Sequence, residues 1–223
     1  MHVLLYILPV LLVMMAQTMV SSSYSKYRNI RTMKGYTGEM VARMILDRHH
    51  LSDVDVGLSK GGIMSDYYDP RLKSVRLSSD VYYGNSLAAI AIAAHEVGHA
   101  IQDAENWYVL RFRNRMIPYV NAICQFGWVI LFLGLLFTST SYLYLGSILL
   151  LTMVIFQLVT LPIEINASKR ALSLLYEGGI VIEDEREGVE NMLRAAAFTY
   201  IAALASSIIY LLRIFMFASN KRN

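Results

Sequence analysis

The stretch that decides the fold is Leu87-Ala-Ala-Ile-Ala-Ile-Ala-Ala-His-Glu-Val-Gly-His-Ala-Ile-Gln102. It is rich in Ala, contains no Pro and predicts a helix over residues 87–104. A helix places residues four apart on one face, so His95 and His99 can offer imidazole nitrogens to one metal ion. Glu96 would lie close enough to act on a water molecule held by that metal. The small residue Gly98 would allow another element to pack closely against this helix.

A second interpretation of this run is a buried structural helix with two hydrogen-bonded histidines and an incidental glutamate. That interpretation is costly, because a glutamate in so apolar a helix needs a partner. The pattern His-Glu-x-x-His is also typical of zinc peptidases, in which the histidines bind zinc and the glutamate acts as general base. We therefore predict that His95 and His99 are zinc ligands and that Glu96 is the catalytic base.

The composition indicates an integral membrane protein. The chain has 223 residues, of which 56% are hydrophobic, and a mean hydropathy of +0.43. A helix needs about 20 predominantly apolar residues to cross a bilayer. Four segments approach or exceed that length: residues 3–20, 117–137, 142–161 and 195–218. Whether the last of them crosses the membrane or lies against the other helices stays open at this stage.

These segments predict a mainly α membrane protein with about four transmembrane helices and a small α+β, zincin-like catalytic domain. The first apolar segment is expected to be a retained anchor, because its positive residues follow it, the opposite of a secretory signal. The predicted parts are an N-terminal anchor (1–20), a zinc peptidase domain (21–116), a transmembrane hairpin (117–161), a third-ligand helix with a cytosolic segment (162–194), and a C-terminal hydrophobic helix with a short tail (195–223).

The charges bear on topology and compartment. The net charge of +3 is small, and the basic residues flank the apolar segments instead of forming a nucleic-acid patch. Because Lys and Arg near membrane spans stay in the cytoplasm, we expect a multi-pass protein of the cell membrane with its active site on the cytosolic face. The single cysteine, Cys124, excludes an intrachain disulfide.

Between the first anchor and the motif helix the pattern changes twice. Apolar residues at helical spacing predict an amphipathic helix over residues 36–50, with Thr37 or Gly38 as N-cap, packed on the motif helix. Short strands follow over residues 54–78, and the alternation in residues 73–78 predicts a half-exposed strand. A hairpin or three-stranded sheet would result. Its edge is either a place where a substrate adds as a strand or simply a cover for the core.

The segment after the hairpin predicts two further helices. A short helix is expected over residues 166–176, after Pro162 and before the break at Gly178-Gly179. The acidic run at residues 183–187 is expected to be a solvated helix start and not a metal site, since carboxylates are favourable near a helix N-terminus.

A catalytic zinc needs a third protein ligand and an open position for water. The candidates on the same membrane side are His49, His50, Asp103, Glu105, Glu164, Glu177 and the acidic run. Glu164 is favoured, because a membrane hairpin with a short polar turn at residues 138–141 returns the chain to the side that it left. A carboxylate at an apolar membrane edge also needs a partner. Pairing of Glu164 with Lys169 or Arg170 is the alternative.

Three segments resemble the YugP-like neutral zinc metallopeptidases, a family of bacterial membrane proteins. They are Gly62-Ile-Met-Ser-Asp-Tyr-Tyr-Asp-Pro-Arg-Leu-Lys-Ser-Val-Arg-Leu-Ser78, Ala93-Ala-His-Glu-Val-Gly-His-Ala-Ile-Gln102 and Leu161-Pro-Ile-Glu-Ile-Asn-Ala-Ser-Lys-Arg-Ala-Leu172. The order of parts is also similar to that of the HtpX and Ste24 membrane proteases.

This resemblance implies one Zn²⁺ per chain, held by His95, His99 and Glu164, with Glu96 as general base. The sequence departs from the family at Asn166, where the resemblance leads us to expect Asp. Such an Asp would be a hydrogen-bond partner of a ligand histidine. Asn keeps an acceptor oxygen but carries no charge, so the tuning of the metal is affected more than its binding.

The expected function is hydrolysis of peptide bonds by a zinc-activated water molecule, with Glu96 as base. The expected partners are a polypeptide substrate, membrane or membrane-proximal, and the lipid bilayer, with no nucleic acid. The alternative is a membrane scaffold or chaperone-like protein with a structural or inactive metal site. A structural zinc usually has four protein ligands, and no fourth Cys or His falls in an obvious place. The sequence singles out neither an oxyanion-stabilising residue nor an oligomeric state.

Overall fold

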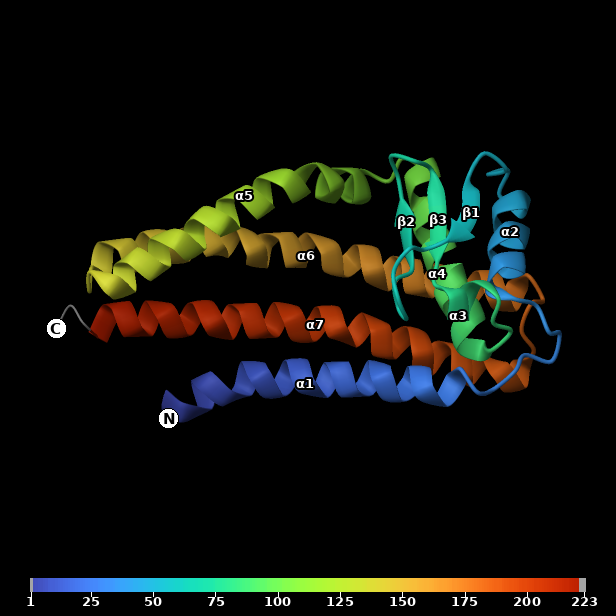
Figure 1. Cartoon of the computed structure of the whole chain (residues 1–223), viewed down its shortest axis with the longest axis horizontal. Helices are drawn as coiled ribbons and strands as arrows, with labels where there is room; N and C mark the ends of the chain where they lie inside the picture. The colour runs from blue at the N-terminus through green and yellow to red at the C-terminus, as the bar shows by residue number, and fades with distance from the viewer. Residues whose placement is uncertain (1, 221–223) are drawn as a thin grey trace. The chain divides into compact units, whose positions relative to one another are not determined.

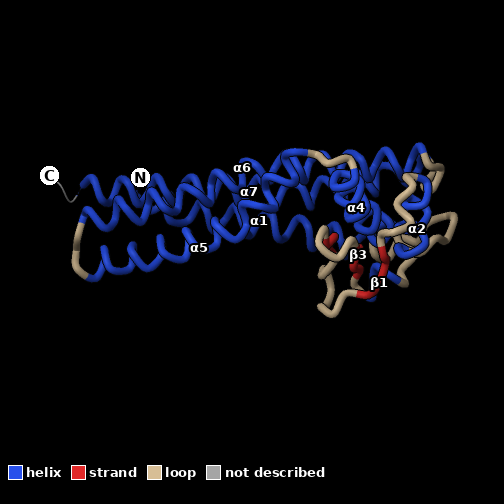
Figure 2. Tube along the Cα trace, turned by 90° about the horizontal axis from the view of Figure 1, so that it is seen from above, coloured by secondary structure: helices blue, strands red, loops and turns tan. Residues whose placement is uncertain are grey.

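Helices dominate this chain, as its composition predicts. The computed structural model describes residues 2–220, and side chains from residue 6 to 219. Figure 2 shows the strands, in red, confined to one small part of the chain. The elements in chain order are α1 (His2–Tyr27), α2 (Gly38–Arg48), β1 (Asp55–Leu58), β2 (Tyr67–Asp69), β3 (Ser74–Leu77), α3 (Ser79–Tyr82), α4 (Leu87–Ala104), α5 (Tyr108–Leu136), α6 (Thr140–Glu177) and α7 (Glu183–Asn220) (Figure 1).

The chain divides into two units. The hydrophobic unit comprises Met1–Gln17, Arg111–Pro162 and Phe198–Asn223, and the mixed unit comprises Thr18–Leu110 and Ile163–Ala197. In the hydrophobic unit, α5 and α6 approach closely at Gly146, where an added Cβ would lie 2.7 Å from the Cγ of Leu131. The mixed unit holds the whole sheet and the motif helix.

Within residues 2–220, four helices are long and apolar enough to cross a membrane, which agrees with the four predicted spans. They are Tyr6–Tyr27, Tyr108–Leu136, Thr140–Glu177 and Glu183–Ser219. Most of their large apolar side chains outside the packed contacts are exposed, as expected for helices that meet lipid rather than water.

Two of the predicted helix boundaries are wrong. The third span and the expected short helix after Pro162 form one continuous helix, α6, with that proline inside it. Proline is tolerated within apolar helices, because neighbouring groups satisfy the carbonyl that loses its N–H partner. Likewise, the acidic run and the last apolar segment form one helix, α7, instead of two consecutive elements.

The helix predicted over residues 36–50 is confirmed as α2, and it packs on α4. Thr37 is its N-cap, and the Thr37 hydroxyl accepts a hydrogen bond of 3.2 Å from the backbone N–H of Met40. Val41, Ala42, Ile45 and Leu46 are buried on the face of α2 that joins the core. The motif helix therefore lies within a packed core.

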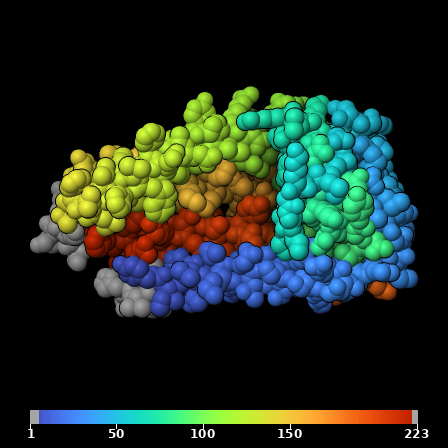
Figure 3. Space-filling model, viewed as in Figure 1, coloured from blue at the N-terminus to red at the C-terminus, as the bar shows by residue number. Residues whose placement is uncertain are grey.

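A three-stranded sheet forms before α4, also as predicted. Its order is β1-β3-β2, with β1 parallel and β2 antiparallel to the central β3. The strand predicted within residues 73–78 is confirmed as β3, but its polar face is not half-exposed, since Ser74 and Ser78 are buried. A central strand that packs on α4 has little access to solvent. Figure 3 shows the sheet and its loops, cyan to green, at the surface of the mixed unit.

Candidate metal centre

The motif helix α4 begins at a capped end and is buried along most of its length. The Ser86 hydroxyl accepts a hydrogen bond of 3.2 Å from the backbone N–H of Ala89. His95 and His99 follow further along α4, one helical turn apart. Their ring centroids lie 4.8 Å apart, and the ring planes meet at 85°. The predicted helical spacing therefore brings both imidazoles to one face of α4.

Gly98 is the point at which α6 approaches α4. A Cβ added at Gly98 would lie 3.0 Å from the carbonyl oxygen of Ala167 and 3.4 Å from its Cα. The expectation that this glycine permits close packing is confirmed. Ala167 follows Glu164 by almost one helical turn, so both lie on the same face of α6. The close approach at Gly98 therefore places Glu164 next to the two histidines.

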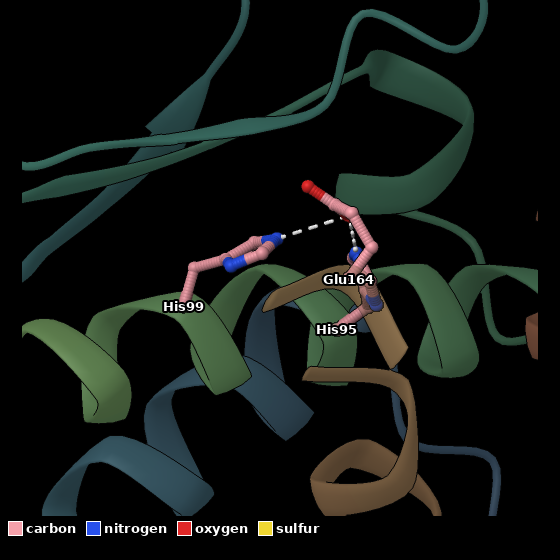
Figure 4. A group of neighbouring side chains, drawn as sticks. All are labelled: His95, His99 and Glu164. Carbon is pink, nitrogen blue, oxygen red and sulfur yellow. Dashed lines mark ion pairs between the residues drawn. The ribbon is translucent and has the colours of Figure 1, made fainter. Parts of the chain in front are cut away.

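His95, His99 and Glu164 converge on one point, as Figure 4 shows. The Oε2 atom of Glu164 lies 3.3 Å from Nε2 of His95 and 3.5 Å from Nε2 of His99. One ligand atom from each residue lies within 4.8 Å of the others. The three side chains are between 5% and 14% exposed, so they face one another in a largely dry place.

The donor set fits a zinc ion. Two imidazole nitrogens and a carboxylate oxygen are common zinc ligands, and three protein ligands leave a fourth position for water. Burial alone lowers the pKa of His99, but the hydrogen bond to Glu164 and the negative charges of Glu96 and Glu164 outweigh it and raise this pKa. The pocket thus favours positive charge at the point where the ligand atoms meet, and a metal cation supplies such charge.

Gln102 supports His99 from the side away from Glu164. Its Oε1 lies 3.0 Å from Nδ1 of His99, and its Nε2 donates to the carbonyl oxygen of Ile163 at 3.1 Å. The same Nε2 donates to Oδ1 of Asn166 at 2.8 Å. Gln102 is fully buried, so these contacts are shielded from water.

The hydrogen bonds of Asn166 go to Gln102 and Arg170 and not to a motif histidine, in contrast to what the resemblance led us to expect of this position. Its Oδ1 accepts from Gln102 and, at 2.9 Å, from Nε of Arg170. Arg170 also donates from both terminal nitrogens to the two carboxylate oxygens of Glu105, each at 2.7 Å. An Asp at position 166 would therefore lie next to a positive charge, that of the Arg170 guanidinium.

Ser168 supports the other histidine. Its hydroxyl lies 3.3 Å from Nδ1 of His95, and the residue is 8% exposed. Ser168 follows Glu164 by four residues, so both lie on the face of α6 that meets α4. A hydroxyl can donate or accept, which makes this support less directional than that of Gln102.

The other third-ligand candidates lie elsewhere. Asp103 accepts a hydrogen bond of 3.0 Å from the Tyr68 hydroxyl, and Glu177 accepts one of 2.7 Å from Ser173. The structure gathers neither of them, nor Glu105, nor His49 and His50 after α2, with the motif histidines. The acidic run begins α7 as predicted, but Glu185 within it is buried and accepts from the backbone N–H of Met33 at 2.7 Å.

Glu96 lies beside the three gathered residues and is partly exposed. Its negative charge reaches both His99 and Asp66. Burial raises the pKa of Asp66, hydrogen bonds from Ser78 lower it, and the charge of Glu96 adds to the rise. Glu96 is thus a carboxylate near solvent at the edge of the candidate centre.

Sequence reasoning missed Gln102 and Ser168. Both could have been found by spacing, because Gln102 follows His99 by three residues and Ser168 follows Glu164 by four. No spacing rule, however, reveals the bond from Gln102 to the backbone carbonyl of Ile163, since that contact depends on how two helices cross.

Comparison with known proteins gives the family. The family model described as "Putative neutral zinc metallopeptidase" matches residues 2–219. The chain belongs to this family. It is also similar to the "Putative membrane protease YugP" of Bacillus subtilis (strain 168), with 42% identity over 208 residues, 93% of this chain and 92% of the relative. No solved structure matches the chain.

Family membership and geometry point the same way. A family described as zinc metallopeptidases implies zinc, and the described residues include a cluster able to hold one. The relative is described as a membrane protease, which agrees with four helices able to cross a membrane. Together they support a protease role for this chain at a membrane.

Proposed function

We propose that this protein is a membrane-embedded zinc metallopeptidase, with His95, His99 and Glu164 as zinc ligands in a zincin-like catalytic domain. The observation that carries the proposal is the convergence of three ligand atoms within 4.8 Å of one another, beside the carboxylate of Glu96. This combination of two histidines, a third ligand and an adjacent base is the arrangement that metal-assisted hydrolysis requires.

Glu96 would act as general acid and base. Zinc held by the three ligands would polarise the scissile carbonyl and acidify the attacking water. Glu96 would accept a proton from the water molecule that attacks the carbonyl carbon, and would deliver that proton to the amide nitrogen as the C–N bond breaks. The partial exposure of Glu96 suits this role, because water and a peptide must both reach it.

We further propose that the substrates are membrane or membrane-proximal polypeptides and that the site faces the cytosol. Lys26 lies in the last turn of α1, Arg28, Arg31 and Lys34 follow that helix, and Arg111, Arg113 and Arg115 lie near the start of α5. This placement supports a cytosolic side for the mixed unit, because basic residues near membrane spans are retained in the cytoplasm. Labelling of single cysteines introduced in the mixed unit of a Cys124→Ser protein, in intact and in opened cells, tests the side.

A scaffold or chaperone-like protein with a structural metal site is the less favoured alternative. Among residues 2–220, the gathered group has three metal-binding side chains, whereas structural zinc sites usually have four. The partly exposed Glu96 beside the group would also have no purpose in a purely structural site.

The proposed function is tested by Glu96→Gln in the full-length, detergent-solubilised protein. We expect zinc stoichiometry to stay near one per chain, while cleavage of a casein or peptide substrate falls about 10²- to 10⁴-fold, the range that general-base catalysis contributes. Glu187→Gln, the same chemical change at an exposed site on α7, should cleave like the wild type. Unchanged proteolysis in the Glu96 variant contradicts the mechanism.

A further inference from the structure

The unusual feature of the centre is a chain of buried polar side chains behind His99. A neutral histidine carries its proton on one ring nitrogen, and only the other nitrogen can bind a metal. His99 turns Nε2 toward Glu164 and Nδ1 toward Gln102. The hydrogen-bond partner of Nδ1 therefore decides whether Nε2 is unprotonated and able to bind a metal.

The contacts of Gln102 fix the orientation of its amide. The carbonyl oxygen of Ile163 can only accept a hydrogen bond, so the atom of Gln102 that lies 3.1 Å from it must be the NH₂ nitrogen. Its second N–H points to Oδ1 of Asn166 at 2.8 Å. The oxygen of Gln102 must then face His99, and because this oxygen only accepts, Nδ1 must carry the proton.

Asn166 is fixed in the same way from its other side. Arg170 has only donors, so the Asn166 atom that lies 2.9 Å from its Nε must be the oxygen. Arg170 is in turn held by the two-pronged contact with Glu105. From Arg170 to His99, each contact thus allows one arrangement of donors and acceptors.

We propose that Gln102 is a positioning residue, which holds His99 in the Nδ1–H form with Nε2 free to bind zinc, and that Asn166 and Arg170 hold Gln102 in the orientation this requires. We call Arg170, Asn166, Gln102 and His99 the amide relay. The inference rests on the proposed zinc site but not on peptide-bond hydrolysis, so binding of zinc alone can test it.

Gln102 also joins α4 to α6 through the Ile163 carbonyl, and a purely structural role is therefore the rival explanation. The two roles differ in how the members of the relay depend on one another. If Asn166 acts through Gln102, its loss has no further effect once Gln102 is gone. If each residue simply stabilises the packing, the two losses add.

The test is the zinc affinity of full-length protein in detergent, measured by competition with a chromophoric chelator at one pH. Gln102→Leu should lower the affinity about 10- to 100-fold, the range found for partners of metal-bound histidines. Asn166→Leu should also lower it, by a smaller factor. Asn166→Asp should keep it, since a carboxylate still accepts from both Gln102 and Arg170. Ser173→Ala removes a hydrogen bond on α6 outside the relay and should not change it.

The decisive measurement is the double variant Gln102→Leu/Asn166→Leu. We expect its zinc affinity to equal that of Gln102→Leu alone. Additive losses would overturn the relay, and so would wild-type affinity in Gln102→Leu. If Gln102→Leu does not fold, Gln102→Met takes its place in the cycle, and Arg170→Gln takes the place of Asn166→Leu. Absence of zinc from the wild type would refute the proposed function itself, whereas a zinc-loaded wild type with an indifferent Gln102 variant refutes only the relay.

Discussion

The surroundings of the two motif histidines differ, although both residues come from one turn of α4. Behind His99, a buried amide is held by a backbone carbonyl, by Asn166 and, through it, by an arginine. Behind His95, there is a hydroxyl, that of Ser168, at 3.3 Å. A hydroxyl rotates and can donate or accept, while an amide fixed at both ends cannot.

This difference shows that the two histidines of the candidate metal centre are not supported equally. The Oε2 atom of Glu164 lies at nearly the same distance from both histidines, 3.3 Å from Nε2 of His95 and 3.5 Å from Nε2 of His99. The asymmetry thus arises entirely behind the rings. It predicts that perturbation of Glu164 affects both histidines, whereas perturbation behind one ring affects zinc binding according to how rigid its support is.

The largest effect is expected from Glu164→Ala, which removes the residue that both histidines share. Zinc content should fall from about one per chain to near zero, because two ligands on one helix bind zinc far more weakly than three. Metal analysis of the purified protein measures this. Glu177→Ala, the same change farther along α6, is the control and should keep its zinc. Full zinc content in the Glu164 variant would mean that another residue is the third ligand.

A smaller loss is expected from Gly98→Ala, which tests the helix contact on which both histidines depend. The new Cβ would lie 3.0 Å from the Ala167 carbonyl oxygen, so α6 must shift by a few tenths of an ångström. Overpacking lowers the free energy of unfolding by about 1–3 kcal/mol, whereas the better helix propensity of Ala raises it by only roughly 1 kcal/mol. We expect zinc affinity to fall about tenfold, or ~1.4 kcal/mol. Gly62→Ala, where an added Cβ meets nothing within 4 Å, should bind zinc normally.

The sequence predicted those parts of the site that depend on local spacing. His95, Glu96 and His99 follow from helical periodicity within one run. Glu164 required a topological argument, that a membrane hairpin returns to its starting side, and the structure brings it to the histidines. Gly98 was recognised by its size alone. Each of these predictions needed only residue types, their order and the geometry of a helix.

The predictions that failed depended on tertiary context. Pro162 predicts a helix start in a soluble chain, but an apolar helix continues through it. The alternation over residues 73–78 predicts an exposed face, yet β3 lies between two strands and against α4. The relay behind His99 could not be predicted, because it includes a backbone carbonyl of another helix. Residue order does not encode where two helices cross.

The weaker support of His95 can be tested directly by Ser168→Ala. Loss of the hydroxyl should lower zinc affinity about threefold, since a neutral hydrogen bond is worth roughly 0.5–1.5 kcal/mol. This loss should be clearly smaller than that of Gln102→Leu in the same chelator competition. Equal losses would show that the two histidines are supported equally well, despite the difference in their neighbours.

The smallest effect concerns Glu105, the half-exposed residue that pairs with Arg170 outside the relay. The hydrogen bond from Arg170 lowers the pKa of Glu105, burial opposes this, and the guanidinium charge lowers the pKa further. A carboxyl whose pKa is lower in the folded state contributes its full stability above the unfolded pKa, roughly 4.3, and loses it as the pH falls through the folded value. Glu105 is half exposed, so screening limits the contribution to about 1 kcal/mol or less.

We therefore expect Glu105→Gln to lower the melting temperature of the metal-free protein by a few degrees at pH 7 and to leave it unchanged well below pH 4, where the wild type has lost the same contribution. Thermal unfolding in detergent at both pH values measures this. Glu187→Gln, an exposed site on α7, should lower it at neither pH. A loss that persists in acid would mean that Glu105 stabilises α4 by packing rather than by charge.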